Sequence, residues 1–152
     1  MNIHILVNDG NDDITDYQSA IKCAGNALLV NEDIYQDYIQ ACIDREQNFP
    51  TGLLLGNGVG IAIPHANAEL VRNSSISIVR LKNSVAFGLM EDASLSVDCR
   101  LVFNLALASG EQHITILRKL VRAFQNDSFI TNCSSMSKEE LVKMVYELLQ
   151  NA

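Results

Sequence analysis

The stretch GVGIAIPHANAE, residues 58–69, contains the clearest structural pattern of the chain. Its apolar segment, residues 61–63, predicts a short buried strand. Pro64 ends this strand, because proline keeps the preceding residue extended and cannot donate a hydrogen bond to a sheet. His65 therefore follows a rigid strand end among small residues. An imidazole in such a place is held firmly and stays accessible to solvent or to a docking protein.

Further strands are predicted around this one by short runs that are β-branched or rich in leucine. We expect them at residues 3–7, 76–81 and 101–108, and the apolar run that stops at Pro64 covers residues 59–63. Residues 50–60 hold four of the chain's eight glycines and are predicted to form a loop. The polar character of residues 84–98 indicates a connection between two strands.

Two helices are predicted before the strand that ends at Pro64. The first covers residues 15–30, because apolar residues recur there every three or four positions and so share one face. These residues are Ile14, Tyr17, Ile21, Ala24 and Leu28. The second helix is expected to be capped by Asn31 and to end near Glu46, since Pro50 and Gly52 cannot continue it. Its predicted buried stripe consists of Ile34, Tyr35, Tyr38, Ile39 and Cys42.

Two more helices are predicted after Gly110, where the spacing of the apolar residues becomes helical. The first of them is expected to place on one face Ile114, Leu117, Val121 and Phe124. The last helix opens with the capping-box pattern SKEE, residues 137–140. Its predicted buried residues are Leu141, Val145 and Leu148 or Leu149.

The element order, helices then strands then helices, predicts an α/β (α+β) fold. We expect a small mixed β-sheet flanked by helices on both faces, because that arrangement buries both faces of the sheet. The chain has no internal repeat, low-complexity run or obvious linker, so residues 1–152 are predicted to form a single domain.

The composition excludes several classes of function. A net charge of −7 without a basic cluster does not suit a nucleic acid or an anionic membrane surface. No run reaches the roughly 18 apolar residues of a membrane helix, and the acidic N-terminus does not resemble a signal peptide. The four cysteines are scattered and form no CxxC, which favours reduced, buried thiols in a cytoplasmic protein.

His65 is the candidate for chemistry. A neutral imidazole is nucleophilic near pH 7, and a phosphoryl group on its nitrogen is labile, provided that the other nitrogen is fixed by an acceptor. The alternative is a loop histidine that caps a turn. The chain lacks a P-loop and a GxSxG elbow, and its GxGxG precedes a strand instead of opening a helix. His65 and His113 have no partner at metal-ligand spacing, so we expect neither a metal nor another cofactor.

Three segments together resemble the enzyme IIA proteins of the bacterial sugar phosphotransferase system (PTS), of the fructose, mannitol and galactitol type. They are GIAIPH at residues 60–65, Arg45-Glu46, and FPTGL at residues 49–53. The FPTGL wording is most similar to the galactitol branch. The turn at residues 55–59 differs in spacing from many members, and its Asn57 stands where an apolar residue is common.

The resemblance implies that residues 1–152 are a PTS enzyme IIA type-2 domain. Such a domain is a phosphotransferase component that accepts phosphate from the phosphocarrier HPr on His65. It passes the phosphate to a cysteine of an enzyme IIB partner, which works with a membrane component IIC in sugar uptake, here of a galactitol-like sugar. The domain would meet the membrane only through these partners. The alternatives are a regulatory phosphohistidine module that signals by binding partners, and a domain that has kept the fold and lost the relay.

Three more residues join His65 through this resemblance. His113 lies at the start of a predicted helix, where it could donate a hydrogen bond to phosphoryl oxygens or be an ordinary surface histidine. Arg45 could clamp the phosphoryl group, or simply favour the C-terminus of its helix. Thr51 could offer its hydroxyl to the phosphate or bond locally in a turn.

Overall fold

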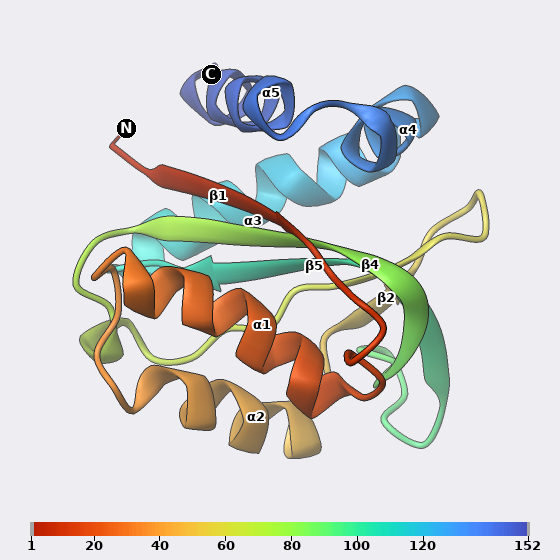
Figure 1. Cartoon of the computed structure of the whole chain (residues 1–152), viewed down its shortest axis with the longest axis horizontal. Coiled ribbons are helices and arrows are strands. Elements are labelled where there is room, and N and C mark those ends of the chain that lie inside the picture. The colour runs from red at the N-terminus through yellow and green to blue at the C-terminus, as the bar shows by residue number, and fades with distance from the viewer. Residues whose placement is uncertain (1, 152) are drawn as a thin grey trace.

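The computed structural model describes residues 2–151, which form a five-stranded mixed sheet between two layers of helices (Figure 1). The sheet has the order β1-β4-β5-β3-β2. The strands are β1 (His4–Asp9), β2 (Gly52–Leu54), β3 (Gly60–Ala62), β4 (Ser75–Gly88) and β5 (Ser96–Ala106). β1 pairs with β4 and β3 pairs with β5 in parallel, whereas the β4–β5 and β2–β3 pairs are antiparallel. The predicted fold class is confirmed.

Helices cover both faces of this sheet. On one side lie α1 (Tyr17–Val30) and α2 (Tyr38–Asn48). On the other side lie α3 (Gly110–Phe124), α4 (Asp127–Ser135) and α5 (Lys138–Gln150). Alternation along β4 supplies both cores, since Ile76 and Ile78 pack toward α3–α5 while Val79 packs toward α1. Among residues 2–151, no helix has the length and apolar character that a membrane crossing requires.

The long hairpin of β4 and β5 corrects the prediction for residues 84–98. Residues 84–88 and 96–98 belong to the strands, and only residues 89–95 connect them. Val85 and Phe87 are buried on β4, where they pair with Cys99 and Val97 on β5. Exposed residues alternate with these four, so the segment has a polar composition although one of its faces belongs to the core.

The predicted start of the second helix is also wrong. Asn31 caps the C-terminus of α1, and Glu32 follows with a positive φ of 59°, which ends the helical path. Ile34 then forms a bridge with Val71, and α2 begins only at Tyr38. Ile34, Tyr38 and Cys42 are buried as predicted, but Tyr35 is exposed.

Two further differences concern the C-terminal helices. In α3 the buried face consists of Ile116, Leu120 and Phe124, whereas Ile114 and Val121 of the predicted stripe are exposed. A separate helix, α4, lies between α3 and α5 and was not predicted. The predicted cap of α5 is confirmed, because the Ser137 side chain accepts a hydrogen bond from the backbone N–H of Glu140.

At Gly60 the backbone of β3 lies close to that of β5, which allows a stability prediction. A Cβ added at Gly60 would collide with the backbone carbonyl of Asp98. We therefore expect Gly60→Ala to lower the free energy of unfolding by about 3 kcal/mol, because two paired backbones must move apart. Gly56→Ala is the control, since its added Cβ meets nothing within 4 Å. Urea unfolding measures both variants, and equal stabilities would contradict the prediction.

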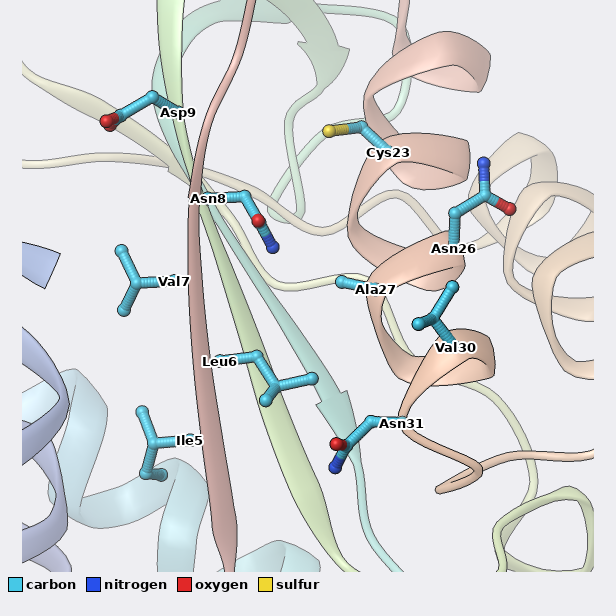
Figure 2. A pocket seen from close by; sticks show the side chains of 10 residues that line it. All are labelled: Ile5, Leu6, Val7, Asn8, Asp9, Cys23, Asn26, Ala27, Val30 and Asn31. Carbon is cyan, nitrogen blue, oxygen red and sulfur yellow. The ribbon is translucent and has the colours of Figure 1, made fainter.

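A groove of about 600 Å³ runs between β1, one of the two edge strands of the sheet, and α1. Figure 2 shows Leu6 and Asn8 of β1 pointing toward Ala27 and Val30 of α1, while Val7 points to the other side of the sheet. None of the residues that line this groove belongs to the histidine site described below.

Candidate functional site

His65 is held at the end of β3 by three backbone contacts. The strand stops at Ala62, and the Pro64 carbonyl then accepts a hydrogen bond of 3.0 Å from the N–H of Leu105 on β5. His65 itself bridges to Leu105 in parallel. Its ring Nδ1 lies 2.9 Å from the carbonyl oxygen of Ile63. A carbonyl only accepts, so Nδ1 carries the proton and Nε2 keeps its lone pair.

His113 lies on α3 and packs beside His65. It lies in the first turns of α3, whose N-cap Ser109 accepts a hydrogen bond from the N–H of Gln112. The two imidazole rings have their centroids 4.7 Å apart at an interplanar angle of 53°. The first N–H groups of α3 have no intrahelical acceptor and give this end of the helix a partial positive charge. The structure thus brings the two predicted histidines together beside a helix N-terminus.

The two rings share a shallow hollow of about 230 Å³, called here the histidine hollow. Its lining residues are Arg45, His65, Ala66, Asn67, Ala68, Leu107, Ser109, Gly110 and His113. Arg45, in the last turn of α2, brings a third predicted residue to the site. Its guanidinium lies 5.4 Å from the centroid of the Phe49 ring. The lining contains two imidazoles and a guanidinium and no carboxylate, so the histidine hollow suits an anion.

Burial favours the neutral form of both imidazoles. It lowers the pKa of His65 below the ordinary value of 6.5, and the charge of Arg45, together with that of His113 when it is protonated, acts in the same direction. The hydrogen bond to Ile63 opposes these effects in part. Burial also lowers the pKa of His113, again with a contribution from Arg45. His65 therefore offers an uncharged nucleophilic nitrogen at neutral pH.

The fourth predicted residue, Thr51, does not line the histidine hollow. It is only 3% exposed, and its hydroxyl oxygen lies 3.0 Å from the Glu46 carboxylate and 3.1 Å from the backbone nitrogen of Ile63. These contacts match the second alternative for Thr51, in which its hydroxyl bonds locally instead of reaching the phosphate. Thr51 lies beside the strand end that carries His65, where it contacts Ile63.

Glu46 is the functional candidate that the sequence reasoning missed. It is 5% exposed, and burial raises its pKa to about 7, against the hydrogen bonds from Thr51 and the charge of Arg45. A signal was present, because Tyr38, Cys42 and Glu46 follow one another at intervals of four on α2. The stripe that predicted burial of Tyr38 and Cys42 also includes Glu46.

Replacing Arg45 with glutamine should raise the pKa of His65, because the guanidinium disfavours the imidazolium form. With a higher pKa, the neutral nucleophile is lost at a higher pH when the solution is acidified. An NMR titration of the His65 ring protons measures the midpoint. Arg118→Gln, on the exposed side of α3, is the control. An unchanged His65 midpoint in Arg45→Gln would show that Arg45 does not act on the ring.

The site has the chemistry required of a protein that holds an anionic group on a histidine. Within residues 2–151, no three His, Cys, Asp or Glu side chains lie close enough together to hold a metal ion. The nucleophile is an imidazole with one nitrogen fixed, and its surroundings favour an anion.

Comparison with known proteins identifies the family. The sequence model of the phosphoenolpyruvate-dependent sugar phosphotransferase system, EIIA 2, matches residues 4–149. The galactitol-specific EIIA component of Escherichia coli K12 is 32% identical over 127 residues, which cover 81% of this chain and 83% of that protein. The mannitol-specific enzyme IIA component of Bacillus subtilis is 30% identical over 142 residues, which cover 91% and 92%. The chain belongs to this EIIA family, and its mannitol and galactitol relatives confirm the predicted resemblance.

A solved structure agrees with this assignment. The complex of mannitol enzyme IIA with phosphorylated enzyme IIB from Escherichia coli matches the fold with a TM-score of 0.67 and 27% identity. The match covers 97% of this chain and 94% of the chain in that structure. A relative of similar fold is thus seen bound to an enzyme IIB component.

Proposed function

We propose that Nε2 of His65 accepts a phosphoryl group from phosphorylated HPr and passes it to a cysteine of an enzyme IIB partner. The observation that carries this proposal is the hydrogen bond from Nδ1 of His65 to the Ile63 carbonyl, which leaves Nε2 as the nucleophile of a ring that lines the histidine hollow. The protein works in the cytoplasm and meets the membrane only through its IIB and IIC partners.

The transfer consists of two displacements at phosphorus. The lone pair of Nε2 attacks, the bond from phosphorus to the HPr imidazole breaks, and that imidazole recovers its electron pair. A IIB thiolate later attacks the same phosphorus, and the electron pair of the P–N bond returns to Nε2. In each step the charge on the three phosphoryl oxygens is stabilised by His113, Arg45 and the N-terminus of α3. The protein contributes mainly position and charge, because the donor bond is already labile.

The partner and the sugar are proposed from the relatives. The mannitol enzyme IIA in the solved complex is bound to phosphorylated enzyme IIB, which supports a IIB partner here. The FPTGL segment at residues 49–53 and the galactitol-specific relative support a galactitol-like polyol as the transported sugar. The carrier itself need not touch the sugar, so we place the specificity in the membrane partner.

A reconstituted phosphate chain tests the proposal. The purified protein is incubated with labelled phosphoenolpyruvate, enzyme I and HPr, and then with IIB proteins of the galactitol and mannitol type. Label should enter this protein only when HPr is present, and it should then leave for a IIB protein. If no label enters this protein in the presence of enzyme I and HPr, the phosphocarrier function is refuted. Labelling without transfer to any IIB protein would favour the regulatory alternative.

A further inference from the structure

Four groups form a continuous chain of hydrogen bonds from a buried carboxylate to the ring of His65. The Thr51 hydroxyl lies 3.0 Å from the Glu46 carboxylate, and the Ile63 N–H donates to the Thr51 hydroxyl over 3.1 Å. The Ile63 carbonyl then accepts the Nδ1 proton of His65 over 2.9 Å. We propose that Glu46 and Thr51 are positioning residues, which hold the Ile63 backbone so that its carbonyl fixes the tautomer and orientation of His65.

This inference rests on the proposed function and deepens it, since it names what prepares the nucleophile. It begins with the register of β2 and β3. Gly52 pairs with Ala62, so Thr51 lies opposite Ile63 one position beyond the last rung of the ladder. At that position the Ile63 N–H donates to a side chain, the Thr51 hydroxyl. A side-chain rung thus replaces a backbone rung just before the proline.

The polarity of the chain follows from the donors and acceptors available. The Glu46 carboxylate already accepts from the Thr51 backbone N–H over 2.6 Å. The Thr51 hydroxyl has a single proton, which it donates to the same carboxylate. Its lone pairs therefore face the Ile63 N–H. Both backbone polar groups of Ile63 are then committed to side chains, one from Thr51 and one from His65.

The burial of the Glu46 carboxyl group costs free energy of folding. Glu46 is almost fully buried without a salt bridge in the described part of the chain, and burial raises the pKa of its carboxyl to about 7. Burying a carboxyl group is unfavourable unless its hydrogen bonds are satisfied. All of its hydrogen-bonding capacity that the structure shows is directed at Thr51. The pair therefore serves the strand end that presents His65.

The test measures the His65 tautomer in the unphosphorylated protein by ¹⁵N NMR. Thr51→Val keeps the shape of the side chain and removes the hydroxyl. We expect the Nδ1–H form to lose population in favour of the Nε2–H form, and phosphoryl transfer from HPr to slow at least about tenfold, by analogy with the partners that orient a metal-bound histidine. Thr51→Ser should restore both quantities. Thr131→Val, on the exposed surface of α4, is the matched control and should change neither.

The outcomes separate this inference from the proposed function. A thermal melt shows whether Thr51→Val is folded. If it is folded and its His65 tautomer population and transfer rate equal those of the wild type, the positioning role is refuted. If it does not fold, the same measurements on Glu46→Gln decide, with a shifted tautomer population as the supporting result and an unchanged one as the refuting result. The tautomer measurement needs no HPr. It therefore stands even where HPr fails to label the wild type, a result that would end only the proposed function.

Discussion

His65→Gln should abolish the labelling of this protein by phosphorylated HPr, with a loss of at least about a thousandfold. A glutamine amide can still donate to the Ile63 carbonyl, but its nitrogen has no nucleophilic lone pair. Transfer therefore fails for lack of an accepting atom. His65 is only partly buried, so the free energy of unfolding should change by less than about 1 kcal/mol. Acid-gel or mass-spectrometric detection of the labile phosphate gives the readout.

His4→Gln provides the matched control. His4, on β1, is the remaining one of the chain's three histidines and does not line the histidine hollow. Its Nδ1 lies 2.8 Å from the buried carboxylate of Asp33. Glutamine keeps an amide donor for that carboxylate, so the fold should survive. Full labelling of His4→Gln with none in His65→Gln is the expected pair of results. Equal labelling of His65→Gln and the wild type would place the phosphate elsewhere.

His113→Ala should have the next largest effect. Its ring lies beside that of His65, where it can donate a hydrogen bond to phosphoryl oxygens. Losing a donor aimed at developing negative charge typically costs a factor of 10² to 10³ in rate, and we expect about a hundredfold for transfer from HPr and for transfer to IIB. The melting temperature should change little, because the side chain is only partly buried and lies near the N-terminus of α3.

His113→Gln separates hydrogen bonding from space filling. Its amide retains a donor near the same position, so part of the lost rate should return. Rapid-quench measurement of both transfer steps provides the comparison. A rate for His113→Ala equal to that of the wild type would remove His113 from the mechanism, and equal rates for the alanine and glutamine variants would remove the hydrogen-bonding account.

Much of the fold was predictable because local patterns and tertiary packing agree. The face of α1 and the cap of α5 follow directly from spacing and from a serine. The hairpin of β4 and β5 was missed, because alternation in a strand with one solvent face lowers the mean hydropathy of residues 84–98. In α3 the helix was predicted but its buried face was not. Ile114 and Ile116 are equally apolar, and only packing decides that Ile116 is buried.

The site was predictable where covalent geometry constrains it. Pro64 must end a strand, so the position of His65 followed from the sequence, whereas the approach of His113 depends on how α3 packs across the sheet. Resemblance supplied His113 and Arg45, and the structure places both in the histidine hollow. The location of Thr51 could not be inferred from the sequence. It depends on the β2–β3 register and on the hydrogen bond that Thr51 makes with the buried Glu46 carboxylate.

The small size of the histidine hollow has a kinetic consequence for the proposed relay. The histidine hollow of about 230 Å³ contains a single proposed nucleophile, which can carry one phosphoryl group at a time, so donor and acceptor proteins must visit in turn. The overall reaction is then a double displacement with ping-pong kinetics. Long-lived association with either visitor would block the other and lower throughput. Fast flux through such a carrier therefore favours brief, weak encounters over tight complexes.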